Sequence, residues 1–286
     1  MILLGISGGP DSMYLLDLIS SQRSDIVVAT LNYNVRQDSA YDVEIVRNFC
    51  KEKNIIFEYL EIDKKACFKG NFEKWAREQR FDFFKKIYEK YNCEALYLAH
   101  HKDDFLESYF MQKESKRQPD FFGIKKENYI YEMKVVRPLV DKVFKSEILE
   151  TLHNKKIEYA NDFTNELPIY TRNKVRSWLK SLSNSQKSQI LDEAEKENNE
   201  LARIENKAVL EYEKWKNSSF SQDLFLTLSN KERLVFKFVH DNYLNIKLSG
   251  GKIKSIIGFI LSDNRTSKYL IKNNIFIQKK HGKLVF

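Results

Sequence analysis

The chain has 286 residues, 42% of them hydrophobic, which suffices for one large domain and a smaller one with full cores. Its three cysteines, Cys50, Cys67 and Cys93, are too few and too scattered for a disulfide framework or a zinc site. No apolar run is long enough to cross a membrane, and the N-terminus lacks signal-peptide features. We therefore expect a protein of the reducing cytoplasm with no membrane partner.

The net charge of +8 is concentrated at the C-terminal end. Residues 218–286 contain twelve Lys or Arg and four Asp or Glu, a surplus equal to the net charge of the whole chain. A basic segment beside a balanced body indicates a polyanionic partner, most simply RNA. A solubilising lysine-rich surface would give the same pattern.

In chain order, the first 112 residues alternate between two patterns. Short apolar runs predict buried strands at residues 2–6, 26–31, 55–62 and 95–99. Helical periodicity occupies residues 13–19, 39–52, 72–91 and 103–112. This alternation predicts an α/β fold, a parallel sheet with helices on both faces, which binds ligands beyond the carboxyl ends of its strands.

The remainder of the chain predicts a second, smaller domain. We expect an outer strand at 129–136, a helix at 145–154, a short strand at 157–160 and a helix from 171. One long amphipathic helix covers 186–216, followed by helices at 231–244 and 252–262 and an alternating strand pattern with turns over 267–286. We therefore predict an α/β body over 1–183, a linker helix over 184–217 and a small α+β domain over 218–286.

The stretch Ser7-Gly8-Gly9-Pro10-Asp11-Ser12 joins the first strand to the first helix. Its glycines allow positive φ, and the helix amides with the hydroxyls of Ser7 and Ser12 suit phosphate. It is neither a Walker loop nor a dinucleotide loop, because both spacings are absent. Asp11 fits beside phosphates only with a divalent cation between them. A serine-capped helix after a glycine turn is the structural alternative.

A second polar cluster, residues 100–108, follows the strand at 95–99. In a helix, His100, Asp104 and Glu107 would fall at i, i+4 and i+7, on one face. Carboxylates with an imidazole can hold Mg²⁺ and move protons near neutral pH. A zinc site is the weaker alternative, since H-E-x-x-H is absent, and a solvated helix start would also give this pattern.

Basic residues form two further clusters. Arg77 and Arg80 lie on the helix at 72–91, and Arg172, Lys174 and Arg176 surround the start of the helix at 171. Guanidinium groups and helix amides suit phosphate or carboxylate ligands. Surface ion pairs are the alternative.

The first loop resembles the pyrophosphate loop of the ATP-pyrophosphatase (PP-loop) superfamily, and the clusters together resemble the tRNA(Ile)-lysidine synthetase family. A-R-E-x-R-Y/F matches 76–81, and H-H-x-x-D-x-x-E-T matches 100–108 with Ser108 for Thr. R-P-L is at 137–139, D-x-S/T-N at 162–165 and R-N-x-I-R at 172–176. The chain departs from the family at 32–36, where Asn-Tyr-Asn-Val-Arg replaces D-H-G-L-R, and at 113–123, which replaces a glycine-rich segment.

The resemblance implies an adenine nucleotide α-hydrolase-like fold, ATP and Mg²⁺. In this family ATP adenylates the 2-oxygen of the wobble cytidine of tRNA(Ile) and pyrophosphate leaves. The amine of free L-lysine then displaces AMP, and codon reading changes from AUG to AUA. We expect the α/β body to be catalytic and residues 218–286 to dock the tRNA; a homodimer is the assembly we consider.

The resemblance also suggests roles for single residues. Asp11 would bind the metal and take part in catalysis. His100 and Asp104 would carry out adenylation and proton transfer. Glu107 would orient the lysine amine, and Arg172 would contact the adenylated intermediate. The phosphates would lie against Ser7, Gly8, Gly9, Pro10, Asp11 and Ser12. The RNA would contact Arg77, Arg80, Arg172, Lys174 and Arg176.

Three other functions remain to be weighed. tRNA thiolases share the first loop, but they need a cysteine pair or iron–sulfur ligands, which three isolated cysteines do not provide. A small-molecule ATP pyrophosphatase would not need the basic C-terminal segment. A non-catalytic RNA-binding protein would not need Asp11, His100 and Asp104 together.

Overall fold

A computed structural model describes residues 1–34, 39–63, 71–115, 119–160, 171–244 and 246–286, and gives only the backbone of Thr171 and Arg172. These residues form two compact units, Met1–Glu195 and Lys196–Phe286. The boundary between the units lies inside helix α7 (Asn184–Asn217), so the two ends of this helix belong to different units.

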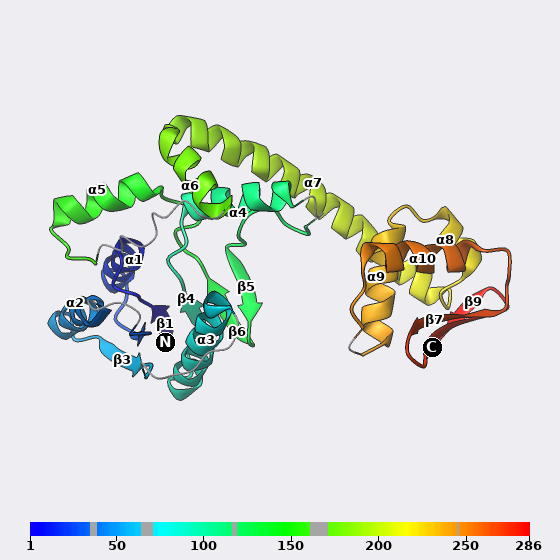
Figure 1. The fold of residues 1–286 in the computed structure, drawn as a ribbon, viewed down its shortest axis with the longest axis horizontal. Helices are drawn as coiled ribbons and strands as arrows, with labels where there is room; N and C mark the ends of the chain where they lie inside the picture. Colours follow the sequence, from blue (N-terminus) through cyan, green and yellow to red (C-terminus); the bar gives the residue numbers. More distant parts are fainter. Residues whose placement is uncertain (35–38, 64–70, 116–118, 161–170, 245) are drawn as a thin grey trace. The chain divides into compact units, whose positions relative to one another are not determined.

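The first unit is built on a six-stranded sheet in the order β3-β2-β1-β4-β6-β5 (Figure 1). Neighbouring strands are parallel except at the edge, where β5 runs antiparallel to β6. The strands are β1 (Ile2–Gly5), β2 (Ile26–Asn32), β3 (Ile56–Glu61), β4 (Ala95–Tyr97), β5 (Glu127–Ile130) and β6 (Met133–Val136). The expected parallel sheet is confirmed, with one antiparallel strand added.

Helices cover both faces of this sheet, as predicted. They are α1 (Pro10–Ser20), α2 (Ser39–Glu52), α3 (Phe72–Lys90), α4 (Lys102–Glu114), α5 (Lys145–Lys155) and α6 (Thr171–Ser181). Alternating residues of β1 separate two cores: Ile2 and Leu4 pack with α1, α2 and α5, whereas Leu3 packs with α3. Period-two alternation in a strand flanked by helices accounts for this division.

Two predicted strands of this unit are wrong. Residues 129–136 form not one outer strand but parts of the hairpin β5–β6, in which Tyr131 (φ 49°) and Glu132 (φ 66°) make the turn. Two successive positive φ values define the turn type that normally uses Asn and Gly, so Tyr131 and Glu132 carry no turn signal. Residues 157–160 form no strand; the amide of Ala160 instead donates to the carbonyl of Gly8, 2.9 Å away.

The second unit packs the C-terminal part of α7 with three helices and an antiparallel sheet in the order β7-β8-β9. Its elements are α8 (Gln222–Thr227), α9 (Lys231–Asn242), α10 (Gly250–Leu261), β7 (Ser267–Lys272), β8 (Ile275–Lys280) and β9 (Lys283–Val285). Trp215, Phe225 and Phe238 lie at the centre of its core. Sequence periodicity missed α8, whose six residues are too few to show a helical repeat.

A buried lysine completes the end of α10. The side chain of Lys279 is fully buried, and its ammonium donates to the carbonyls of Phe259 (3.0 Å) and Ser262 (3.1 Å). Cations are favourable at helix C-termini, where carbonyl groups lack intrahelical partners. Lys279 is therefore part of the core and not of the basic surface.

The turn from β1 to α1 admits only glycine at one of its two glycine positions. Gly8 has φ +86°, and a Cβ there would lie 2.6 Å from the carbonyl oxygen of Asp42 in α2. Gly9 has φ −71°, and its Cβ would meet nothing nearer than the Ser7 hydroxyl at 3.6 Å. The turn therefore owes its shape to Gly8 and to the backbone of α2.

We predict that Gly8→Ala destabilises the protein far more than Gly9→Ala. A left-handed conformation costs a non-glycine residue about 1–2 kcal/mol, and the clash with Asp42 adds to this. Thermal unfolding should show Gly8→Ala melting at least about 3 °C below the wild type and Gly9→Ala within about 1 °C. Equal melting temperatures for the two variants would contradict the geometry of this turn.

A second prediction concerns Glu211 of α7, whose carboxylate accepts hydrogen bonds from the amides of Ser229 (3.2 Å) and Asn230 (3.0 Å) ahead of α9. Burial alone would raise the pKa of Glu211, but the hydrogen bond from the Ser229 hydroxyl, together with these two amide bonds, outweighs it and lowers the pKa to about 2. A carboxylate with a lowered pKa stabilises the fold above its unfolded pKa, and this contribution disappears as the pH falls from about 4.5 to about 2. Glu211→Gln should destabilise the second unit by about 1 kcal/mol at pH 7 and remove this pH dependence.

Hydrogen exchange of the α9 amides as a function of pH measures this effect locally. Exposed Glu213→Gln, which removes the same charge from the same helix, serves as the control and should leave exchange unchanged. Equal exchange in the two variants would show that Glu211 does not stabilise the start of α9.

Candidate active site

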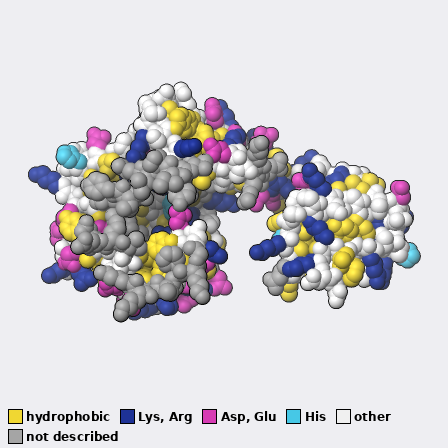
Figure 2. Space-filling model, viewed as in Figure 1, with side chains coloured by type: hydrophobic (Ala, Val, Ile, Leu, Met, Phe, Trp, Pro, Cys, Tyr) yellow, Lys and Arg dark blue, Asp and Glu magenta, His cyan; other side chains and the backbone are white. Residues whose placement is uncertain are grey.

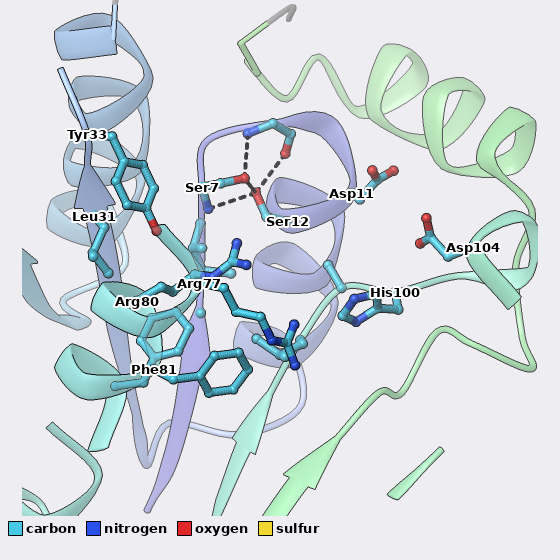
Figure 3. A pocket seen from close by; sticks show the side chains of 16 residues that line it. Ser7, Asp11, Ser12, Leu31, Tyr33, Arg77, Arg80, Phe81, His100 and Asp104 are labelled. Carbon is cyan, nitrogen blue, oxygen red and sulfur yellow. Dashed lines mark hydrogen bonds between the residues drawn. The ribbon is translucent and has the colours of Figure 1, made fainter. Parts of the chain in front are cut away.

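A pocket lies at the carboxyl ends of β1, β2 and β4, where an α/β sheet is expected to bind its ligand (Figure 3). Its apolar lining residues are Gly5, Ile6, Leu31, Tyr33, Phe81, Phe84, Leu98 and Ala99. Its polar groups come from Ser7, Asp11, Ser12, Arg77, Arg80, His100, Asp104 and the backbone of Gly9. These last eight residues all belong to the predicted site, so the fold brings together clusters that lie far apart in the sequence.

The loop between β1 and α1 is held by its own serines. The Ser12 hydroxyl donates to the carbonyl of Gly9 (2.8 Å) and accepts from the amide of Ser7 (3.2 Å). Pro10 begins α1, and no side chain caps the helix at Gly9. The first-turn amides thus remain open to an anion, supported by the positive end of the helix dipole.

His101 is the site residue to which sequence reasoning gave no role. Its Nε2 atom lies 3.5 Å from a carboxylate oxygen of Asp11 and 3.5 Å from one of Asp104, and its Nδ1 atom lies 3.6 Å from Asp103. The expectation that His100, Asp104 and Glu107 share one helical face is wrong, because α4 starts at Lys102 and His101 is its N-cap. His101 therefore caps α4 and contacts the carboxylates, whereas His100 lies before the helix.

The cluster shifts the pKa values of its members in different directions. Burial alone would lower the pKa of His101, but contact with Asp11 and the charges of Asp104 and Asp103 outweigh it, so the pKa is raised. Burial would raise the pKa of Asp11, yet His101 and Lys145 lower it. For Asp104 burial prevails over His101, and its pKa is raised. Asp11 is thus the carboxylate that stays charged, and Asp104 the one that can carry a proton.

Two lysines from distant segments balance the charge of this cluster. Lys145, at the start of α5, contacts Asp11 at 2.5 Å, and its own amide donates to Asp103 at 2.8 Å. Lys187 of α7 reaches the other oxygen of Asp103 at 2.6 Å and is almost fully buried. Neither lysine stands near Asp11 or Asp103 in the sequence, so no local pattern could have identified them.

His100 lies outside the helix and lines the pocket. Burial, followed by the charges of Arg137 and Arg80, lowers the pKa of His100 to about 4, so the ring is neutral at neutral pH. Its Nδ1 atom is buried, and no other described residue hydrogen-bonds to it. A neutral imidazole with an unused nitrogen can accept or donate a hydrogen bond to a ligand.

The arginines of the two predicted basic clusters have different surroundings. Arg77 and Arg80 of α3 line the pocket, with the Arg77 guanidinium over the Phe81 ring at 4.7 Å. Arg176 of α6 instead donates to Glu107 at 2.6 Å, and Glu107 is buried away from the pocket lining. Lys174 is exposed. The Arg172 side chain and the motif at 162–165 lie outside the described residues.

Tyr33 occupies a position at which the chain departs from the family pattern. Its hydroxyl donates to the carbonyl of Ala76 (2.8 Å), and its ring packs beside Phe72 and Trp75. Tyr33 also lines the pocket. Tyr33 therefore lines the pocket and holds α3, which carries Arg77 and Arg80, beside the end of β2.

The carboxylates fit Mg²⁺ held together with a phosphate-bearing ligand. Among the described residues, no three or more His, Cys, Asp or Glu side chains form a group that could hold a metal by themselves. Mg²⁺ is typically bound by one or two carboxylates plus substrate phosphates and water. Asp11, which lies in the first turn of α1 beside the phosphate loop and keeps its charge, matches that requirement.

Two of the three cysteines are described, and neither is part of the pocket. Cys50 and Cys93 are buried, and burial raises the pKa of Cys50 to about 12. Also within the described residues, no helix is both long and apolar enough to cross a membrane.

Comparison with known proteins agrees with this geometry. A family model described as "PP-loop domain" matches residues 1–182. A protein of Mycoplasmopsis pulmonis named tRNA(Ile)-lysidine synthase is 40% identical over 98% of this chain and 96% of its own. A protein of the same name from Mesomycoplasma hyopneumoniae is 34% identical over 99% of this chain and 94% of its own.

Among solved structures, the U34-tRNA thiolase NcsA from Methanococcus maripaludis shares the fold. Its TM-score is 0.57 at 18% identity, and the match covers 69% of this chain and 72% of that one. The full-length relatives are more informative, because they extend through both units. The chain belongs to the tRNA(Ile)-lysidine synthase family of PP-loop proteins.

Proposed function

We propose that the protein is an ATP-dependent ligase that joins lysine to the 2-position of the wobble cytidine of tRNA(Ile), forming lysidine and releasing AMP and pyrophosphate. The observation that carries this proposal is one pocket in which the phosphate loop meets Asp11, Asp104, His100 and paired arginines. Full-length relatives of the same name support it. The acceptor chemistry, lysine included, is inferred from that family membership.

In the pocket, the phosphates and the adenine of ATP contact different lining residues. The phosphates bind the loop at Ser7–Ser12 and the open amides of α1, and the adenine packs beside the apolar residues Leu31 and Phe81. Asp11 would hold Mg²⁺, which offsets negative charge on the phosphates. Arg77 and Arg80 add positive charge to the pocket lining and stabilise the negative charge that develops as pyrophosphate leaves.

The proton chemistry is assigned to Asp104 and His100. Free lysine reacts only after its ammonium, with a pKa of about 10.4, has lost a proton. Asp104 suits the acceptor role because its raised pKa lies nearer to neutrality than that of an exposed carboxylate. His100, neutral and with one unused nitrogen, hydrogen-bonds the reacting cytidine or the phosphate.

Glu107 remains our candidate for orienting the lysine amine. Arg176 already holds one of its oxygens, so the position of the carboxylate is fixed before any substrate arrives. Arg176 is then a positioning residue, and RNA contact at α6 falls to Arg172 and Lys174. In this proposal residues 1–183 are catalytic, 184–217 form the linker helix, 218–286 dock the tRNA, and two copies form the assembly.

One assay tests the proposed function directly. The protein is incubated with ATP, Mg²⁺, labelled lysine and an isoleucine tRNA bearing a wobble cytidine, and label should enter the RNA. The same tRNA with guanosine at the wobble position is the control and should stay unlabelled. Release of pyrophosphate with some other acceptor, and no label in the RNA, would refute the lysidine assignment.

A second prediction isolates the role of Asp11. Asp11→Asn should lower the rate of pyrophosphate release at least 100-fold, because the charge that offsets the phosphates is lost, while tRNA affinity changes less than twofold. Asp17→Asn removes the same charge from the same helix but pairs with Lys155 outside the pocket, and should retain full activity. Comparable rates for the two variants would exclude Asp11 from catalysis.

A further inference from the structure

The sheet of the second unit has one face that its own core does not cover. Its register pairs Leu270 with Phe276 and Lys280 with Lys283, and aligns Lys268 and Val285 with Gln278. Ile277 and Leu284, whose side chains point the opposite way, are buried in the core. We call the outward surface of Lys268, Leu270, Phe276, Lys280, Lys283 and Val285 the open sheet face.

The open sheet face combines exposed apolar and cationic side chains. Leu270, Phe276 and Val285 are 48%, 41% and 38% exposed, and the three lysines are exposed as well. Each of these lysines lacks an ion pair to any other described residue, and the six positions include no acid. Lys280 and Lys283 are directly opposite each other, an arrangement of like charges that weakens a sheet unless an anion binds there.

These side chains match the chemistry of RNA. Lysines neutralise backbone phosphates, and an aromatic ring on an open sheet stacks unpaired bases. We propose that the open sheet face is the RNA-binding surface of the second unit, with Phe276 stacking an unpaired base and Lys268, Lys280 and Lys283 contacting phosphates. This inference rests on the proposed function for its ligand, a tRNA, and goes beyond it by naming the surface.

A second exposed aromatic site in the same unit lacks this combination. Phe236 stacks on His240 on α9, with ring centroids 4.0 Å apart. The cations of α9 already have partners: Arg233 pairs with Glu205 and Lys237 with Asp241. Lys231 donates to the carbonyls of Leu226 and Leu228. Hydrophobic and basic side chains are interspersed on the face of this unit seen in Figure 2, so composition alone does not select a surface. The open sheet face is selected because it combines lysines without ion pairs and an exposed aromatic ring, Phe276.

The test measures tRNA binding by full-length variants as a function of salt. Lys280→Glu with Lys283→Glu should weaken binding at least 30-fold at about 0.1 M salt and reduce the slope of log K against log salt by about 2. Phe276→Ala should weaken binding about 5- to 100-fold with an unchanged slope. Each variant must keep the wild-type melting temperature within about 2 °C, and Phe276→Leu provides a second, milder substitution.

Matched controls come from the same unit. Lys247→Glu with Lys254→Glu makes the same change in net charge at exposed positions off this face, and Phe236→Ala removes an exposed aromatic ring from α9. Both should bind tRNA within about threefold of the wild type. Equal losses in control and test variants would overturn the inference, as would unchanged binding by the test variants.

The outcomes also separate this inference from the proposed function. If the wild type makes lysidine and the open-sheet-face variants bind tRNA normally, the surface is wrong and the function stands. If the face variants lose RNA binding but the wild type transfers no lysine, the function is wrong and the surface stands. Loss of binding to vesicles of anionic phospholipid, with tRNA binding intact, would assign the face to a membrane surface and overturn the inference.

Discussion

The site depends on one electrostatic constraint, three carboxylates gathered around the buried imidazole of His101. Asp11 comes from the end of the phosphate loop, and Asp103 and Asp104 come from the start of α4. Like charges at such distances, partly shielded from water, repel strongly unless cations intervene. Lys145 and Lys187 supply this positive charge, and the raised pKa of His101 favours the charged form of its imidazole. The packing of β1, β4, α5 and the first turns of α7 around the pocket is therefore also a requirement of charge balance.

The same arrangement separates the duties of the carboxylates before any substrate binds. Lys145 keeps Asp11 ionised, which suits a metal ligand, and Lys187 together with the Lys145 amide fixes Asp103 as a support for the imidazole. Asp104 has no such lysine, and its pKa is raised by burial. Neighbouring carboxylates whose pKa values differ because of their surroundings are the usual means of assigning acid and base roles within one site.

Local sequence was sufficient for the polar residues of the pocket lining but not for what holds them. The strand–loop–helix pattern located Ser7 to Ser12, and His100 and Asp104 follow β4, so the ends of two neighbouring strands bring these groups to one edge of the sheet. Arg77 lies within α3 and was located by its motif alone. The interpretation that placed His100 on the same helix as Asp104 hid the cap His101, because α4 starts only at Lys102. Lys145 and Lys187 are separated from their partners by 134 and 84 residues, so only the packed fold reveals them. The turn at Tyr131 and Glu132 gave no signal because neither residue is one that favours positive φ.

In the second unit, the number of lysines in the sequence does not show which of them are exposed. Composition assigns all its lysines to one basic surface, yet the adjacent Lys279 and Lys280 point to opposite sides of β8. Lys279 satisfies the carbonyls at the end of α10 and is unavailable to any partner, whereas Lys280 faces outward beside Lys283 and Phe276. The alternation of a strand thus divides one run of charge into a structural part and a binding part. Because a shift of one residue in β8 would bury Lys280 and expose Lys279, the register that caps α10 also sets which lysines can meet RNA.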